Sequence, residues 1–315
     1  MRILAAAGCD ALVFGAENPD TALLQKAGRV LCSEAYRTAL KQQLAAGARS
    51  FAAARQAAVQ ALCPGSDVAA LLDKPNNNLA VEYCKAIIEQ NVEMQPIALP
   101  RQGADHGQAL TESSHTAFAS ASALRALWAE GGAAALAPYV PEKALKLYKQ
   151  AEYDGKYTDF AVMGHCELAL LRAACAGQAP FAAVRGVSEG LEHRLENAVR
   201  ETASLPALLD ALTTVRYPRA RMRRLAMDAA LGYTAQTPAL PPYLHLLGAR
   251  KEALSLPGET ALPLSHSLAR LARENETCAQ MAAAQSRASD LGALCRTKPE
   301  PMGGIYRQKI IFLTN

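Results

Sequence analysis

Two serines and an arginine near the middle of the chain are the clearest candidates for binding chemistry. Ser120 and Ser122 lie in the segment ASASALR, which Arg125 closes. If a helix begins here, its first amide groups, the hydroxyl groups and one guanidinium group converge on one place, as an anion such as phosphate requires. A simpler interpretation makes Ser120 a helix N-cap and leaves Arg125 facing solvent, and the residues alone favour it.

A glycine and an asparagine earlier in the chain have properties that suit nucleotide recognition. Gly15 follows a short apolar run, and a residue without Cβ at the end of a strand lets a ligand approach the backbone. It could equally serve only a tight turn. Asn76, in a polar loop before a helix, has an amide that both donates and accepts hydrogen bonds. The alternative is helix capping or an Asx turn, which we prefer for Asn77 and Asn78.

A dense group of arginines near residue 220 predicts a cationic surface. Its members are Arg216, Arg219, Arg221, Arg223 and Arg224. On a helix they would point to more than one side, which suits contact with an RNA backbone, and Tyr217 among them could stack on a base. Alternatively, some pair with Glu189, Glu192 and Glu196 inside a helical domain. The positive excess of the chain, net +4 overall, lies beyond residue 140 and could be only a solvated surface.

Cysteine and histidine usage gives no indication of a metal site. The 8 cysteines and 6 histidines form no CxxC, HExxH or HxH pattern, so we expect buried free thiols and no protein-bound metal. The apolar run at 1–7 is too short for a signal-peptide core or a membrane span. We therefore expect a cytoplasmic protein without a membrane partner.

The first part of the chain alternates strand and helix patterns. Apolar runs at 9–14 and 94–99 predict two strands of one parallel sheet, and helical spacing at 20–46, 50–62 and 79–90 predicts the helices that cover it. Two strands are too few for a stable open sheet. We therefore expect the remaining strands in another chain or upstream of Met1.

The second part reads as mainly helical. Helical patterns cover 122–130, 142–153, 157–176, 189–202, 206–214 and 219–231. The apolar tail at 305–313 could form a closing strand, and the run GGAAALA at 131–137 is the best linker candidate. With half of its 315 residues apolar, the chain is long enough for two domains, which we place at 1–130 and 131–315.

Several local patterns, taken in order, resemble one known family. They are ALVFGAENPD at 11–20, KPNNNLAVEY at 74–83, ASASALR at 119–125, EGLEHR at 189–194 with RYPRARMRR at 216–224, and YLHLLG at 243–248. Each alone is weak, but the ordered set spans most of the chain. It is similar to the tRNA(Met) cytidine acetate ligase family, which belongs to the nucleotidyltransferase superfamily of the HxGH type.

The resemblance implies a fold and a set of binding residues. Residues 1–130 would form an incomplete Rossmann-like nucleotidyltransferase layer of α/β class that binds ATP, and residues 131–315 a mainly helical tRNA-binding domain. The residues implied for ATP binding are Gly15, Asn76, Arg125, Ser120 and Ser122, and those for tRNA are Arg216, Tyr217, Arg221 and Arg224. Arg219 and Arg223 look like additions to the family pattern. ATP would be a substrate, with Mg²⁺ as its candidate companion.

The implied reaction has two steps. Acetate attacks the α-phosphorus of ATP to give acetyl-adenylate and pyrophosphate, and the exocyclic amine of the wobble cytidine in elongator tRNA(Met) then takes the acetyl group, forming N4-acetylcytidine. Members of the family open with a strand and an HxGH loop whose histidines bind the ATP phosphates. This sequence has no HxGH, and its nearest string, DHG at 105–107, falls just before the serine and arginine motif.

No catalytic residue can therefore be assigned, and we expect this chain alone to be catalytically impaired. The missing strand and loop are expected upstream of Met1. An alternative is a tRNA-binding protein that has lost catalysis. The reading frame before the Met1 codon would distinguish the two: an NPFHxGH-like segment supports the enzyme, and a stop codon supports the alternative. A third interpretation, nucleotidyl transfer to a small metabolite, would need no arginine-rich helical domain.

Overall fold

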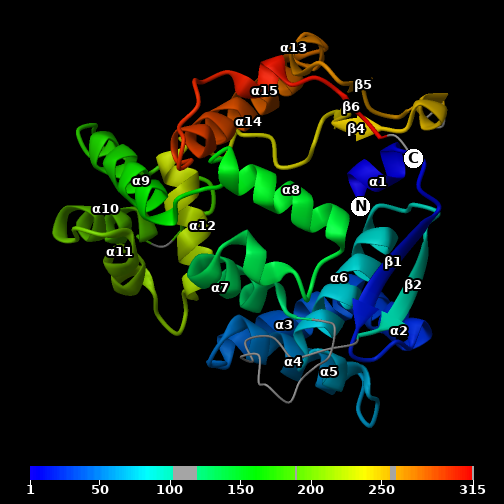
Figure 1. Cartoon of the computed structure of the whole chain (residues 1–315). Coiled ribbons are helices and arrows are strands. Elements are labelled where there is room, and N and C mark those ends of the chain that lie inside the picture. Colours follow the sequence, from blue (N-terminus) through cyan, green and yellow to red (C-terminus); the bar gives the residue numbers. More distant parts are fainter. Residues whose placement is uncertain (102–118, 189, 256–259, 314–315) are drawn as a thin grey trace.

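A parallel pair of strands forms the centre of the first part of the molecule. The computed structural model describes residues 1–101, 119–188, 190–255 and 260–313. Strand β1 (Ala11–Ala16) pairs with β2 (Gln95–Pro100) in register from Ala11 opposite Gln95 to Ala16 opposite Pro100. Figure 1 shows the pair beside the helices that connect its strands. The sequence prediction of one sheet containing both strands is confirmed.

Helices fill the connection between the two strands. They are α2 (Thr21–Cys32), α3 (Glu34–Ala45), α4 (Phe51–Leu62), α5 (Val68–Leu71) and α6 (Pro75–Glu89), and the short α1 (Arg2–Ala6) precedes β1. The helix predicted over 20–46 is two helices, because the backbone of Ser33 is extended and its Oγ accepts the Tyr36 N–H at 3.1 Å as the cap of α3. Asp20, the first residue of the range predicted as helical, caps α2 and accepts the Leu23 N–H at 3.0 Å.

One face of the strand pair is buried and the other is open. Phe14 and Ala16 of β1 pack into a cluster with side chains of α2 and α6. On the other face, Val13 is 56% exposed and Leu99 is 51% exposed. Parallel sheets are normally covered on both faces. Among the described residues, this pair departs from that arrangement on the face of Val13 and Leu99.

The middle of the chain is helical. It contains α7 (Ala121–Gly131), the 3₁₀ helix η1 (Ala133–Leu136), α8 (Glu142–Tyr153), α9 (Phe160–Ala174), α10 (Leu191–Glu201), α11 (Leu205–Leu212) and α12 (Arg219–Ala230). Its main core joins α9 to α12 through Leu171, Leu195, Leu208 and Met222. Helix α7 packs on η1, which follows the expected domain boundary at residue 130, so that boundary stays a prediction.

The last part combines short strands with one long helix. Its elements are β3 (Leu244–His245), β4 (Gly248–Ala249), η2 (Lys251–Ser255), β5 (Leu264–Ser265), α13 (Leu268–Leu271), α14 (Glu276–Leu294), α15 (Gly304–Arg307) and β6 (Ile311–Phe312). Strand β3 pairs with β5 and β4 with β6, both in parallel. The predicted closing strand is therefore shorter than expected, and α15 occupies the start of its range. Within the described ranges, no helix is long and apolar enough to span a membrane.

Candidate functional site

The carboxyl end of β1 is tied to the start of α6 by one glutamate. Glu17 directly follows β1, and its Oε1 and Oε2 accept the backbone N–H groups of Asn76 at 3.1 Å and Asn77 at 2.6 Å. The first amides of a helix have no partner within the helix. Glu17 thus caps α6 from a distant segment, and with Pro75 at the first position it lets α6 begin earlier than predicted. Asn76 therefore lies in the first helical turn and not in a loop.

The amide of Asn76 bridges a carboxylate and a guanidinium group. Its Nδ2 donates to Glu17 Oε1 at 2.7 Å, and its Oδ1 accepts from Arg101 Nη1 at 2.7 Å. Arg101 directly follows β2, so the bridge joins the ends of both strands. Sequence reasoning missed Glu17 and Arg101 as members of this site, although Glu17 stands inside the quoted motif ALVFGAENPD.

The surroundings of Glu17 keep its carboxylate ionised. Partial burial acts to raise the pKa of Glu17, but the hydrogen bonds from Asn76 and Asn77 lower that pKa overall. Asn77 is buried and its Oδ1 accepts the N–H of Asn18 at 2.8 Å, so it has the structural role that we preferred for it. Asn78 likewise donates from Nδ2 to the Lys74 carbonyl at 3.2 Å.

Gly15 does not form the tight turn that its position suggested. It lies inside β1, opposite Leu99 of β2, because the strand pairing continues to Ala16. A Cβ built on Gly15 would have no atom within 4 Å, so packing does not require glycine here. Gly15 and Asn76 are brought to the same end of the sheet through Glu17.

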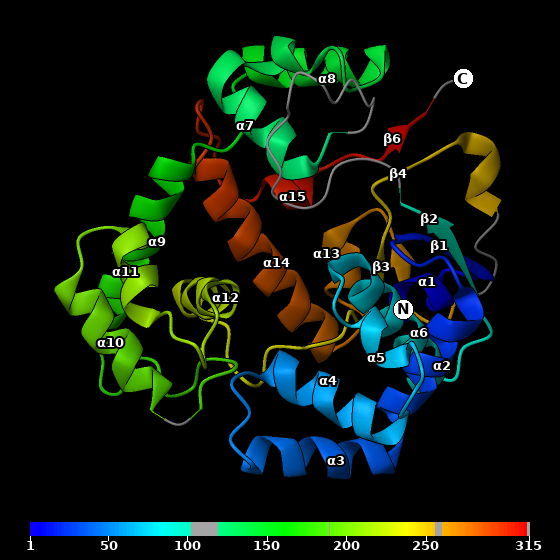
Figure 2. The same ribbon diagram turned by 90° about the horizontal axis from the view of Figure 1, so that it is seen from below.

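The serine and arginine motif forms the start of α7. Ser120 Oγ accepts the Ala123 N–H at 3.2 Å as an N-cap and lies 3.0 Å from Ser122 Oγ. Arg125 is exposed and stands at the beginning of the second turn of α7. Figures 1 and 2 both show α7 to one side of β1 and β2. A common ATP site for Gly15, Asn76 and Arg125 stays a prediction.

The arginine group lies partly before α12 and partly on it. Arg216 and Tyr217 precede the helix, which begins at Arg219 after Pro218, so the group does not share one helix as assumed. The reason is a turn: the Thr214 N–H donates to the Tyr217 carbonyl at 3.0 Å, and the Tyr217 N–H donates to Thr214 Oγ1 at 3.0 Å.

Tyr217 is the centre of the cationic surface. The guanidinium carbon of Arg221 lies 5.1 Å from the centroid of its ring, and that of Arg216 lies 5.7 Å from it, both within cation–π range. Arg224 is exposed on α12. Arg219 forms an ion pair with Asp210. Arg219 thus does pair internally, although its partner is not one of the expected glutamates. One of those, Glu189, lies outside the described residues.

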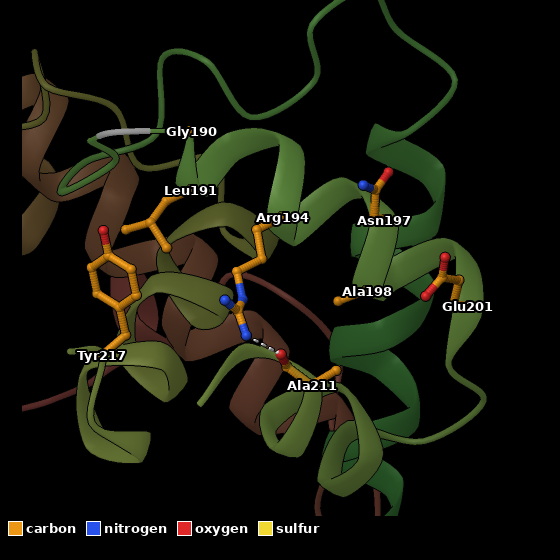
Figure 3. Close-up of a pocket in the computed structure, with 8 residues that line it drawn as sticks. All are labelled: Gly190, Leu191, Arg194, Asn197, Ala198, Glu201, Ala211 and Tyr217. Carbon is orange, nitrogen blue, oxygen red and sulfur yellow. Dashed lines mark hydrogen bonds between the residues drawn. The ribbon is translucent and has the colours of Figure 1, made fainter. Parts of the chain in front are cut away.

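A groove runs beside Tyr217. It has a volume of about 510 Å³ and lies between α10, α11 and the segment before α12. Its lining residues are Gly190, Leu191, Arg194, Asn197, Ala198, Glu201, Ala211 and Tyr217. Figure 3 shows Arg194 reaching from α10 towards α11, where its Nη2 donates to the Ala211 carbonyl at 2.7 Å. In the described part of the chain, no cluster of His, Cys, Asp or Glu could hold a metal ion.

Comparison with protein families gives a match over nearly the whole chain. Residues 1–303 match the family model described as HIGH Nucleotidyl Transferase. A protein of Listeria monocytogenes serotype 4b (strain CLIP80459) named tRNA(Met) cytidine acetate ligase is 30% identical over 257 residues, which are 80% of this chain and 62% of that protein. One of the same name from Thermoanaerobacter sp. (strain X514) is 28% identical over 246 residues, 76% of this chain and 59% of its own. The chain spans about three fifths of the length of these relatives.

Solved structures show the same fold. Thermotoga maritima TmcAL bound with alpha-thio ATP superposes with a TM-score of 0.84 at 21% identity, covering 99% of this chain and 79% of that chain. Its apo form superposes with a TM-score of 0.86 at 22% identity over the same shares. The architecture is an α/β nucleotidyltransferase fold with small parallel sheets, as the sequence predicted.

Proposed function

This chain belongs to the HIGH Nucleotidyl Transferase family, and on that premise we propose that it acts in the ATP-dependent acetylation of cytidine in tRNA(Met). The observation that carries the proposal is the similarity to relatives named tRNA(Met) cytidine acetate ligase, which extends over 80% of the chain. The product would be N4-acetylcytidine at the wobble position of elongator tRNA(Met), and the site of action the cytoplasm.

The first step would activate acetate. A carboxylate oxygen of acetate bonds to the α-phosphorus of ATP, whose bond to the bridging oxygen breaks to release pyrophosphate. We propose that ATP, accompanied by Mg²⁺, is bound by Gly15 in β1, by Asn76 at the start of α6, and by Ser120, Ser122 and Arg125 at the start of α7. Because Glu17 and Arg101 already hold the amide of Asn76, Asn76 would act from a fixed orientation, as electrostatic catalysis requires.

The second step would transfer the acetyl group. The N4 amine of cytidine attacks the carbonyl carbon of acetyl-adenylate, AMP leaves, and the amine loses a proton. Arg216, Arg221 and Arg224 would contact tRNA phosphates, with Tyr217 beside them. The cation–π contacts around Tyr217 support this role because they hold two of the guanidinium groups at the surface.

One observation favours a second candidate function. No HxGH string occurs in the 315 residues, so the histidines that would stabilise the ATP phosphates are not among them. We propose that the 315-residue chain by itself binds tRNA but is impaired in acetate activation. The second candidate function is that of a non-catalytic tRNA-binding protein of the same family.

Two measurements on the same preparation test the proposal. Acetate-dependent exchange of pyrophosphate into ATP reports the first step, and mass spectrometry of nucleosides from a tRNA(Met) transcript reports the second. We expect exchange and N4-acetylcytidine to be weak or absent and tRNA to bind. Efficient acetylation would show that the chain is not impaired, whereas failure to bind tRNA would contradict both candidate functions.

A further inference from the structure

The groove between α10, α11 and Tyr217 has the size and lining of a nucleotide site. We propose that it binds one unstacked nucleotide of single-stranded RNA, with the base in the groove and the adjoining phosphates on the arginines at its rim. The inference rests on the proposed function in that RNA is the substrate. It adds a base-reading site that is separate from the residues assigned to ATP.

The shape and the apolar part of the groove suit a base. A volume of about 510 Å³ falls within the range of small-ligand sites, about 300–1,000 Å³. Leu191 and Ala198 are buried beneath it, and the half-buried ring of Tyr217 stands at one side. Such a surface can cover an aromatic base that has left its stack.

The polar part of the groove can read the edge of a base. Arg194, Asn197 and Glu201 follow one another along one face of α10, at helical spacing. Asn197 and Glu201 are exposed, and together they offer an amide and a carboxylate. Arg194 Nε is buried without a hydrogen-bond partner among the described residues. The groove therefore holds donors and acceptors that a ligand could satisfy.

Two arginines stand beside the groove at Tyr217. Arg216 and Arg221 both contact the ring of Tyr217, which itself lines the groove. Phosphates on either side of a bound base would meet these guanidinium groups. An acidic peptide would also be attracted to them, but its side chains would be repelled by Glu201. A nucleotide fits both the arginines and Glu201, because its phosphates would meet the guanidinium groups and its neutral base would lie beside the carboxylate.

The carboxylate of Glu201 gives the groove a preference for cytosine over uracil. A carboxylate accepts hydrogen bonds from an exocyclic amine, such as N4 of cytosine, whereas uracil has a carbonyl at that position. Cytidine should therefore bind more tightly than uridine. Replacing the carboxylate with an amide, which can also donate, should remove most of that difference.

The test uses fluorescein-labelled pentacytidine and pentauridine with the full 315-residue chain, measured by fluorescence anisotropy. Ala211 is exposed on α11 and lines the groove, so Ala211→Leu fills it without changing charge. Ala207 is exposed one turn earlier on α11 and outside the groove, so Ala207→Leu is the matched control. We expect pentacytidine to bind Ala211→Leu about tenfold more weakly, equivalent to about 1.4 kcal/mol, and Ala207→Leu like the unchanged chain. Glu201→Gln should bind pentacytidine and pentauridine alike.

Binding of a tRNA(Met) transcript, measured in parallel, separates this inference from the proposed function. If the unchanged chain binds the transcript but Ala211→Leu and Ala207→Leu bind pentacytidine equally, the groove does not hold a base and the proposed function stands. Equal affinity of the unchanged chain for pentacytidine and pentauridine would overturn the assignment of Glu201. Pentaglutamate binding that displaces pentacytidine would assign the groove to acidic peptides instead. If no RNA binds, the proposed function itself is wrong.

Discussion

At the scale of single residues, the structure is organised by contacts between distant parts of the sequence. Asn76 was predicted as a hydrogen-bonding residue from its type alone, and it does donate and accept. Its partners Glu17 and Arg101 could not be predicted, because local patterns and periodicity do not indicate which distant side chains meet. For the same reason the burial of Glu167 could not be predicted. Its carboxylate is buried in α9, but its sequence neighbours form an ordinary helical pattern.

Glu17→Gln should destabilise the strand and helix layer. Hydrogen bonds to a charged group contribute about 1.5–3 kcal/mol, and glutamine can replace only part of those that Glu17 accepts. We expect the free energy of unfolding in urea at pH 7 to fall by about 1–2 kcal/mol. Glu93→Gln, at an exposed glutamate, is the control and should change this free energy little.

Because the pKa of Glu17 is lowered in the folded state, the difference in stability between the unchanged chain and Glu17→Gln should shrink as pH falls through that pKa. Equal stability of the two Gln variants would contradict the capping role.

Glu167 should give the opposite pH dependence. Burial raises its pKa to about 7 although Arg223 lowers it, and its Oε1 has no hydrogen-bond partner among the described residues. The folded state therefore holds the proton more tightly than the unfolded state, and stability is lost as pH rises from about 4.5 to about 7, by up to about 1.4 kcal/mol per pH unit.

Glu167→Gln removes this titration. Urea unfolding at pH 5 and pH 8 should show a smaller loss of stability in the variant than in the unchanged chain, with the variant the more stable of the two at pH 8. If both proteins lose the same stability between these pH values, Glu167 is not the group responsible.

At the scale of elements, prediction succeeded where local chemistry sets the boundary. Asp20, Ser50 and Ser120 were placed at or before helix starts, and each caps a helix through its side chain. The break at Ser33 was missed because alanine and leucine continue the helical pattern on both sides of it. The two-residue strands β3, β4 and β5 could not be predicted, since each depends on a partner far away in the sequence.

Gly28 lies where α2 packs closely against α6. A Cβ at Gly28 of α2 would lie 2.9 Å from the backbone nitrogen of Lys85 on α6. One of the two helices would have to move to relieve this contact. Gly28→Ala should therefore lower stability even though alanine favours a helix by about 1 kcal/mol.

Gly292→Ala is the matched control for that substitution. Gly292 lies in α14, and its added Cβ would have no atom within 4 Å, so the variant should gain about 0.5–1 kcal/mol. Thermal unfolding should place the midpoints of the two variants on opposite sides of the unchanged chain. A stabilising Gly28→Ala would show that α2 and α6 are not in close contact.

At the scale of the whole molecule, the order of strands and helices along the chain was predictable, whereas the way they pack against one another was not. Alternating strand and helix patterns followed by long helical periodicity predicted an α/β layer and a helical region. The packing of α7 on η1, and its placement beside α8 in Figure 2, depend on contacts that no local pattern specifies.

The salt dependence of tRNA binding tests RNA contact by the cationic surface most directly. A filter-binding titration at several salt concentrations would compare the unchanged chain with the triple variant Arg216→Ala, Arg221→Ala and Arg224→Ala. Removing one arginine that binds a phosphate should flatten the slope of log affinity against log salt by about one unit. Arg37→Ala, Lys41→Ala and Arg49→Ala together remove the same charge from exposed positions in the strand and helix layer. We predict weaker binding and a flatter slope only for the first triple variant. Equal affinity and slope in both triple variants would contradict RNA contact by this surface.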